Sequence, residues 1–279
     1  MSPAWGGGEP LAGRSIVVYS EQGLGDTVQF ARYIPLLAER GAQVHAVVQP
    51  PLQSLIGRIE GVQSVGSVDG IWPDCDFNCA LLSLPRAFHT DLASIPAKVP
   101  YLAAARDRVE KAALGLASAG KLRIGAVWSG NPAHTNDRNR SIPINVLSPV
   151  LTSATPGWVS LQKTLRPGEA ELLRAAGAID FSDQLADFED TAGVLAQLDL
   201  LVSVDTSVAH LAGALGIPTW ILLPYAPDWR WFLERDDSPW YPTVRLFRQT
   251  EPGNWDSVMT RLAKALEHDL PPRRGTIAP

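Results

Sequence analysis

Two short polar segments of this 279-residue chain carry the side chains best suited to chemistry on an anionic substrate. Residues 22–27 read Gln-Gly-Leu-Gly-Asp-Thr, and residues 203–210 read Ser-Val-Asp-Thr-Ser-Val-Ala-His. Each segment follows an apolar run typical of a strand and opens a helical pattern, and a helix N-terminus attracts anions. Because such turns line the ligand crevice of an open α/β sheet, the pair predicts a two-domain enzyme with a charged substrate between its halves.

Asp26 is the candidate catalytic residue of the first segment, because a carboxylate at this position can act as a general base. A second interpretation is a helix N-cap, in which the carboxylate accepts hydrogen bonds from the amides of Val28 or Gln29 and adds about 1 kcal/mol of stability. The sequence leaves both interpretations open. The loop residues that we expect to lie beside it in the cleft are Gln22, Gly23 and Gly25.

The second segment places Asp205, Thr206 and Ser207 at the start of one helix. One of these side chains is expected to cap the helix, which leaves the others to meet a hydroxyl or a phosphate. His210 lies one turn later, near the mouth of the same turn, as a ligand-binding residue or as a histidine bonded to a neighbouring carbonyl. We expect Asp26 and His210 to face each other when the domains come together.

Two loops after predicted strands carry candidate cations. Arg138 and Arg140 follow one strand, and guanidinium groups bond phosphate oxygens in pairs, so these arginines are a candidate clamp for a diphosphate. Solvated loop arginines are the alternative interpretation. Gln162 and Lys163 end the next strand, again at the expected ligand edge, where Lys163 is either a second cation or a surface lysine.

Aromatic residues gather late in the chain. Residues 225–232 read Tyr-Ala-Pro-Asp-Trp-Arg-Trp-Phe, and Trp240-Tyr241 follow soon after. Such a group can form stacking faces for a sugar or a base, whereas burial for core packing is the commoner use of these side chains. The sequence alone does not separate the two.

The pattern of possible metal ligands is poor. Cys75 and Cys79 lack a second cysteine pair or suitably spaced histidines, so we expect no structural metal site. Residues 74–76 match the D-x-D pattern of metal-dependent glycosyltransferases, but the pattern is short enough to arise by chance, and no carboxylate cluster accompanies it. We therefore expect neither a bound metal nor a cofactor.

Apolar runs of strand length alternate with segments of helical period, which predicts stacked βα units and a mostly parallel sheet. Pro35 is expected to kink the first helix. The predicted strands are residues 15–20, 43–48, 122–128, 158–162, 198–204 and 218–223, with another near Phe77. The predicted helices are residues 26–40, a short one after Pro51, one within 97–121, and 145–151, 168–176, 190–197, 207–215 and 255–268.

Composition bounds the function. The net charge of −5 argues against nucleic-acid binding, because little surface is left to neutralise phosphates. A hydrophobic content of 46% can supply two cores. No run of about 18 apolar residues and no secretory pattern occurs, so we expect a cytoplasmic protein without a transmembrane segment. The predicted domains are residues 1–115 and 116–270, followed by a flexible tail, 271–279.

Four ordered motifs resemble those of a known family. They are residues 21–27 (Glu-Gln-Gly-Leu-Gly-Asp-Thr), 127–132 (Val-Trp-Ser-Gly-Asn-Pro), 160–163 (Ser-Leu-Gln-Lys) and 205–212 (Asp-Thr-Ser-Val-Ala-His-Leu-Ala). They look like the bacterial glycosyltransferases that are fused behind tetratricopeptide repeats, which are similar to the ADP-heptose:lipopolysaccharide heptosyltransferases of glycosyltransferase family 9. The resemblance spans roughly residues 5–249, and the opening segment resembles the junction after the repeats, as in a stand-alone or truncated catalytic part.

The resemblance implies a GT-B architecture, in which two Rossmann-like domains face each other across a cleft. The N-terminal half would form the acceptor side, with Asp26 as the base, and the C-terminal half would bind the nucleotide sugar. The donor-binding residues that it implies, together with the candidates above, are Ser129, Asn131, Arg138, Arg140, Gln162, Lys163, Asp205, Thr206, Ser207 and His210.

These observations predict a metal-independent glycosyltransferase of the hexosyl- or heptosyl-transferase type. It would move a sugar from a nucleotide-diphosphate sugar to a hydroxyl group of a protein, lipid or glycan, with Asp26 accepting the proton. A nucleotide-sugar epimerase or hydrolase is the alternative enzyme, since these also use facing Rossmann-like domains. A catalytically silent nucleotide-sugar-binding module is the alternative outside catalysis.

Overall fold

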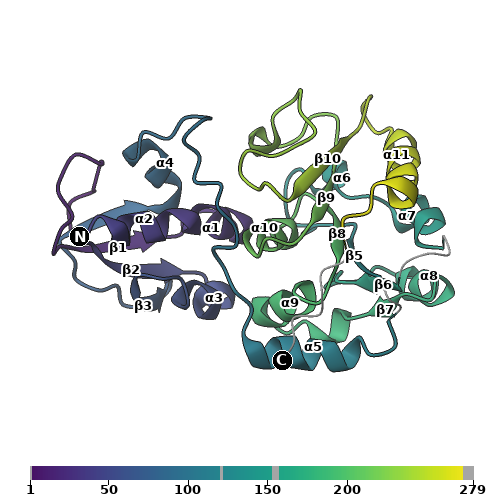
Figure 1. The fold of residues 1–279 in the computed structure, drawn as a ribbon, viewed down its shortest axis with the longest axis horizontal. Helices are drawn as coiled ribbons and strands as arrows, with labels where there is room; N and C mark the ends of the chain where they lie inside the picture. Colours follow the sequence, from purple (N-terminus) through teal and green to yellow (C-terminus); the bar gives the residue numbers. More distant parts are fainter. Residues whose placement is uncertain (1, 120–121, 153–156, 273–279) are drawn as a thin grey trace. The chain divides into compact units, whose positions relative to one another are not determined.

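The computed structural model describes residues 2–119, 122–152 and 157–272. Its contacts separate two compact units, Met1–Ala103 and Ala104–Pro279. Each unit is built on one parallel β-sheet with helices packed against it (Figure 1). The tail predicted for residues 271–279 lies outside the described residues from position 273 onward.

The sheet of the first unit has the strand order β3-β2-β1-β4, and all of its pairs are parallel. Ile16 and the buried valines of the two central strands contribute to its core, which is typical of a sheet covered on both faces. The strands are β1 (Ser15–Tyr19), β2 (Gln43–Val48), β3 (Val62–Ser67) and β4 (Phe77–Ala80). The helices are α1 (Leu24–Phe30), η1 (Ala31–Tyr33), α2 (Ile34–Glu39), η2 (Pro50–Leu52), α3 (Gln53–Gly57), η3 (Leu81–Ser83) and α4 (Leu84–Ala87).

The helix predicted over residues 26–40 is interrupted near Pro35, where we expected a kink. Pro35 lacks an N–H and its ring crowds the carbonyl of Ala31, so the chain tightens into the 3₁₀ turn η1 between α1 and α2. The helical stretch ends at Gly41, as predicted. Gly41 has a φ of +81°, and the amide of Ala42 donates to the carbonyl of Leu37 at 3.2 Å, which closes the last turn.

The sheet of the second unit has the strand order β10-β9-β8-β5-β6-β7, again with parallel pairs throughout. The strands are β5 (Arg123–Val127), β6 (Gly157–Ser160), β7 (Ile179–Asp180), β8 (Leu200–Val204), β9 (Thr219–Leu223) and β10 (Val244–Arg248). The helices are α5 (Arg106–Gly115), α6 (Asp137–Arg140), α7 (Ile144–Leu151), α8 (Glu169–Ala175), η4 (Ser182–Gln184), α9 (Phe188–Leu195), α10 (Ser207–Ala214), η5 (Trp229–Trp231) and α11 (Trp255–His268).

The second core joins the strands to the helices α7, α8 and α11 along one face of this sheet. Trp128, which follows β5, is fully buried, and its indole Nε1 donates to Glu169 Oε1 at 2.9 Å. The second carboxylate oxygen of Glu169 accepts from the amide of Arg166 at 2.8 Å, so both oxygens of this buried carboxylate have a hydrogen-bond partner. The strand end that leads to residue 129 is therefore held rigidly.

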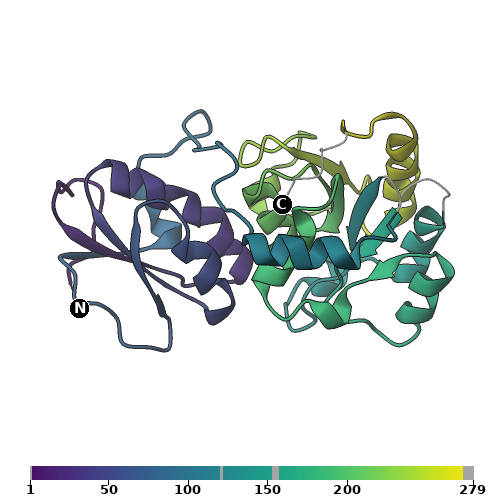
Figure 2. The ribbon, with the colours of Figure 1, turned by 60° about the horizontal axis from the view of Figure 1, so that its bottom comes forward.

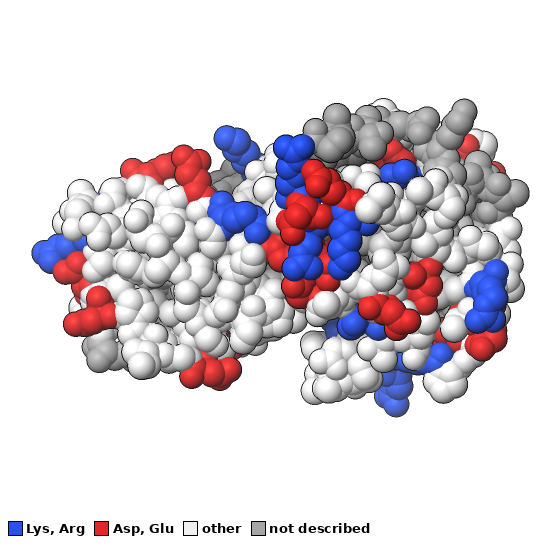
Figure 3. All heavy atoms as spheres, turned by 90° about the horizontal axis from the view of Figure 1, so that it is seen from below, with Lys and Arg blue, Asp and Glu red and all other residues white. Residues whose placement is uncertain are grey.

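The helix α5 belongs to the second unit because it packs against α9 (Figure 2). The division of contacts falls between residues 103 and 104, whereas the predicted domain boundary lies between residues 115 and 116. The buried carboxylate of Asp190 on α9 joins the two helices. It accepts hydrogen bonds from Arg108 Nη1 at 2.7 Å and from Lys111 Nζ at 2.8 Å. On this side of the molecule, charges of both signs lie next to one another (Figure 3).

Within the described part of the chain, no helix combines the length and the apolar composition that are needed to cross a bilayer.

We expect Asp190→Asn to lower the free energy of unfolding at pH 7 by about 1.5–3 kcal/mol, because a neutral amide cannot replace hydrogen bonds between charged groups. Urea denaturation measures this loss. Asp183→Asn is the matched control, since Asp183 is an exposed carboxylate in the same unit, and its replacement is expected to change stability little.

The loss is expected to depend on pH. Burial alone raises the pKa of the Asp190 carboxyl, but the hydrogen bonds from Lys111 and Arg108 outweigh it and hold the pKa below its ordinary value. The stabilisation is therefore complete above the ordinary carboxyl pKa, about 4, and disappears as the pH falls through the lower value of the folded state. A gap between wild type and variant that stays constant from neutral to strongly acidic pH contradicts this account.

Candidate functional site

In the first unit, Asp26 is the third residue of α1 and Gly23 is its N-cap. Asp26 Oδ2 accepts a hydrogen bond from the amide of Gly23 at 2.8 Å, so the carboxylate reaches back over the turn. The predicted cap on the amides of Val28 or Gln29 is wrong in this respect, because a side chain in the third position points toward the preceding loop rather than along the helix. Asp26 is half-buried, and the loop at Gly23 is exposed.

Gln49 fixes this loop, and sequence reasoning missed it. It directly follows β2, the strand beside β1, so both strand ends lie at the same edge of the sheet. Gln49 Nε2 donates to the carbonyl of Gln22 at 2.8 Å, and Gln49 Oε1 accepts from Thr27 Oγ1 at 2.9 Å. One amide therefore holds both sides of the turn that presents Asp26. Its position just after a central strand was the available signal.

In the second unit, the sheet order brings three predicted segments to one edge. The strands β6, β5 and β8 are neighbours, and their parallel pairing places the residues that follow them side by side. Ser129, Gln162 and Asp205 follow these strands. The structure thus gathers predicted donor-binding residues that are far apart in the sequence, as expected for the carboxyl edge of an α/β sheet.

Gln162 holds the loop after β5 in place. Its side chain is buried, and its Oε1 accepts from the amides of Ser129 at 3.0 Å and Trp128 at 3.2 Å. Its Nε2 donates to the carbonyl of Thr164 at 3.4 Å. The amide is thus engaged by backbone groups, and it positions the loop. Ser129 itself is buried beside it.

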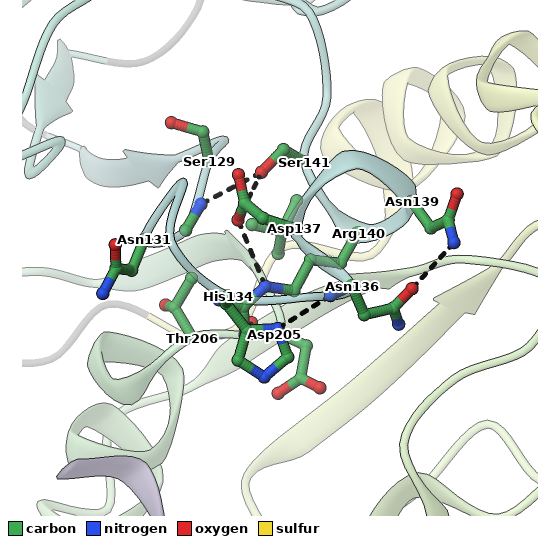
Figure 4. Close-up of polar contacts among 12 residues, drawn as sticks. Ser129, Asn131, His134, Asn136, Asp137, Asn139, Arg140, Ser141, Asp205 and Thr206 are labelled. Atoms are coloured by element: carbon green, nitrogen blue, oxygen red, sulfur yellow. Dashed lines mark hydrogen bonds and ion pairs between the residues drawn. The ribbon is translucent and has the colours of Figure 1, made fainter. Parts of the chain in front are cut away.

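The turn after residue 130 is organised around the buried carboxylate of Asp137 (Figure 4). Asp137 Oδ1 accepts from Ser141 Oγ at 3.0 Å and from Arg140 Nε at 3.3 Å. Arg140 Nη1 also donates to the backbone carbonyl of Asp205 at 3.0 Å. Arg140 therefore ties this turn to the loop after β8, and its side chain is only 15% exposed.

Arg138 lies elsewhere. It is exposed, and it lines a cavity of about 670 Å³ that does not include Arg140 among its walls. Arg166, 51% exposed, lines the same cavity, 3.6 Å from Asp137 Oδ2. The remaining wall residues are Pro132, His134, Thr135, Asp137, Asn139, Ser141, Pro143, Gly253 and Trp255. The two arginines that line the same cavity are therefore Arg138 and Arg166, and not Arg138 and Arg140 as predicted.

The other predicted side chains of these loops are exposed. Asn131 Oδ1 accepts from the amide of Ala133 at 3.0 Å, which shapes its own turn. Lys163 Nζ donates to the carbonyl of Ser182 at 3.3 Å. Both remain at the carboxyl edge with exposed surface.

The start of α10 carries no side-chain cap among the residues that the structure describes. Thr206 is its N-cap, and Thr206 Oγ1 lies 3.3 Å from Ser203 Oγ instead of bonding to an amide of the first turn. The prediction that one of the three polar side chains caps the helix is therefore wrong. The first-turn amides of this eight-residue helix are left for water or an anion.

Asp205, which precedes α10, and His210, which lies on α10, are close neighbours. His210 Nε2 is 3.8 Å from Asp205 Oδ1, and the histidine is buried. Burial raises the pKa of the Asp205 carboxyl, and the neighbouring Asp228 raises it further, while the Trp231 side chain, Arg140 and Arg230 act in the opposite direction. The side chain of Asp205 keeps 16% of its surface exposed.

Trp231 and Tyr241, from the aromatic-rich segment 225–241, complete this group. His210 Nδ1 lies 2.9 Å from Tyr241 Oη, and the imidazole stacks on Trp231 with ring centroids 5.3 Å apart. Both aromatic side chains are fully buried. The sequence had left these aromatics open between core packing and stacking, and the structure gives Tyr241 a polar contact with a predicted site residue.

The described residues contain no group of three potential metal ligands of the His, Cys, Asp or Glu type. Cys75 and Cys79 are buried free thiols, and burial raises the pKa of Cys79 to about 11. Asp76 of the D-x-D pattern binds Arg14 and Ser15, so it serves the local structure.

With this geometry, the protein has the GT-B fold class of glycosyltransferases, and the predicted resemblance to the heptosyltransferases of family 9 is confirmed at the level of the fold. In solved structures, the chain is similar to a glycosyl transferase family 9 protein from Veillonella parvula, with a TM-score of 0.69 and 12% identity, covering 93% of this chain and 97% of that one. It is also similar to the E. coli ADP-heptose LPS heptosyltransferase II, with a TM-score of 0.62 and 14% identity, covering 91% and 97%.

A curated relative is protein FlbA of Caulobacter vibrioides, which is 26% identical over 286 residues covering 93% of this chain. The chain spans about half of that relative's length, 47%. No family model matches the sequence. At these identities the likeness to solved structures establishes the fold.

We expect Gly130→Ala to disturb the turn around Asp137. A Cβ at this position would lie within 3.0 Å of Arg140 and Asp137, and both groups are held by further hydrogen bonds. The variant should lose about 1–3 kcal/mol of unfolding free energy, measured in urea. Gly8→Ala, where the added methyl meets open space, is the control. Equal stability of the two variants would show that the turn adjusts freely.

Proposed function

We propose that the protein is a glycosyltransferase that moves a sugar from a nucleotide-diphosphate sugar to a hydroxyl acceptor. The observation that carries the proposal is the carboxyl edge of the second unit. There, an uncapped helix start, the Asp205 and His210 pair and a cavity with two arginines lie on one GT-B scaffold. These groups match a ligand that is anionic at one end and rich in hydroxyl groups at the other.

The donor diphosphate would be held by backbone amides and side-chain cations together. The first-turn amides of α10 carry the positive end of the helix dipole, about half an elementary charge. Arg138 and Arg166 have exposed guanidinium groups that can bond phosphate oxygens in pairs. One structural neighbour is named an ADP-heptose heptosyltransferase, which supports a nucleotide-diphosphate sugar as the donor class.

In the proposed reaction, Asp26 takes the proton of the acceptor hydroxyl while the oxygen of that hydroxyl forms a bond to the anomeric carbon of the sugar. The bond between that carbon and the diphosphate oxygen breaks, and the nucleoside diphosphate leaves as an anion. Its growing negative charge would be stabilised by the α10 amides and the arginines, so we propose that no metal is required. Tying Asp26 to the amide of Gly23 holds the carboxylate in one orientation.

A panel of ADP-, UDP-, GDP- and CDP-sugars tests the donor by thermal shift. A sugar nucleotide present at about 100 times its dissociation constant stabilises the folded protein by about 2.7 kcal/mol. The double variant with Arg138→Ala and Arg166→Ala should bind the same donor at least about tenfold more weakly, because two charge-assisted hydrogen-bonding groups are removed. Arg174→Ala, an exposed arginine on α8, is the matched control and should bind as wild type does.

No shift with any member of the panel would refute the donor site. Release of nucleoside diphosphate that requires an added acceptor identifies a transferase, whereas release without an acceptor identifies a hydrolase. Binding without release identifies a silent module.

Asp26→Asn should reduce turnover by about 10²- to 10⁴-fold, which is the usual contribution of a positioned general base. The amide oxygen of asparagine can still accept from Gly23, so the fold and donor affinity should persist, as circular dichroism and thermal shift will show. Glu21→Gln, which changes an exposed carboxylate five positions earlier in the chain, is the control. Wild-type turnover in Asp26→Asn would remove this residue from the catalytic role.

A further inference from the structure

We propose that Tyr241 is a positioning residue that fixes the tautomer and the rotation of the His210 imidazole. This inference rests on the proposed function, because it concerns a histidine of the donor site. The contact is direct, since Tyr241 Oη lies 2.9 Å from His210 Nδ1 and both groups are buried. The tyrosine hydroxyl can donate to Nδ1, and the Asp205 carboxylate on the other side can only favour a proton on Nε2, so the two neighbours together select one tautomer of the imidazole.

The ring of His210 is confined by aromatic groups on the same segment between β9 and β10. Trp231 stacks on it at an interplanar angle of 26°, and Tyr241 packs at 58° with ring centroids 5.8 Å apart. The chain leaves η5 through Phe232, which has a φ of +56° and a ψ of −168°, a region that non-glycine residues rarely adopt. Such strain persists only where surrounding contacts hold it, and it gathers at functional sites.

The helix that carries His210 makes room for Tyr241. Gly213 lies on α10, and a Cβ there would approach Tyr241 Cδ1 to 2.5 Å. Glycine inside a helix costs about 1 kcal/mol relative to alanine. The tyrosine ring can therefore lie against α10 beside His210 only because this position lacks a side chain.

The opposite nitrogen of His210 faces the Asp205 carboxylate. His210 Nε2 lies 3.8 Å from Asp205 Oδ1, and the Asp205 side chain is 16% exposed. The other charged groups acting on the Asp205 carboxyl are Arg140, Asp228 and Arg230, of which the last two lie on the segment after β9. Arg140 also donates to the backbone carbonyl of Asp205. With Nδ1 held by the hydroxyl, Nε2 is presented toward Asp205 and toward a hydroxyl-bearing ligand that reaches it.

Tyr241→Phe removes the hydroxyl and keeps the ring, and ¹⁵N-edited NMR of the imidazole nitrogens reads the result. In the wild type, His210 should show one fixed tautomer, with its signal assigned by its loss in His210→Gln. In Tyr241→Phe, both tautomers should appear, and the affinity for the donor found by the panel should fall about 5- to 10-fold, the value of one hydrogen bond. Tyr33→Phe loses a buried hydroxyl bonded to Thr90 in the first unit and should change neither reading.

Unchanged imidazole signals in Tyr241→Phe overturn the proposal, whatever the activity of the protein. Changed signals with unchanged donor affinity also overturn it, because the fixed orientation would then serve nothing at this site. If no sugar nucleotide binds the wild type, the proposed function fails, and the NMR comparison still decides whether Tyr241 fixes the ring. Gly213→Ala, which pushes against the tyrosine ring, should reproduce the mixed tautomers in a second variant.

Discussion

Parallel strand pairing is the constraint on which the rest of this structure depends. In a parallel sheet every strand ends at the same edge, so the residues after β5, β6 and β8 become neighbours although long stretches of chain separate them. Ser129, Gln162 and Asp205 meet in this way in the second unit. The first unit repeats the arrangement, where Gln49 after β2 holds the loop that follows β1.

The loops at these edges leave the sheet, so their backbone groups need other partners. A buried amide or carbonyl without a partner costs about 1–3 kcal/mol, and side chains of the loops supply the missing bonds. Gln162 accepts from two amides, and Arg140 donates to the carbonyl of Asp205. Residues that look equally suited to a ligand in the sequence therefore divide into those that build the loops and those, such as Arg138, that stay exposed beside a cavity.

Local physical signals predicted much of the fold. The strand at residues 43–48 and the helix at residues 255–268 begin and end where the apolar pattern placed them. The strands that were missed, β3, β7 and β10, all lie at the edges of their sheets, where one flank has no neighbouring strand and the apolar run is short or interrupted. Polar turns after central strands likewise predicted which segments would share an edge.

By itself, the sequence determined the α/β class, the polar turns and the candidate residues, because those depend on periodicity and on the chemistry of single side chains. Only the tertiary structure decided their partners. It paired Arg140 with Asp137, gave Asp26 the amide of Gly23, and set Tyr241 against His210. The physical reason is that a hydrogen bond depends on distances of a few tenths of an ångström between groups that are remote in the chain, and no local pattern encodes those distances.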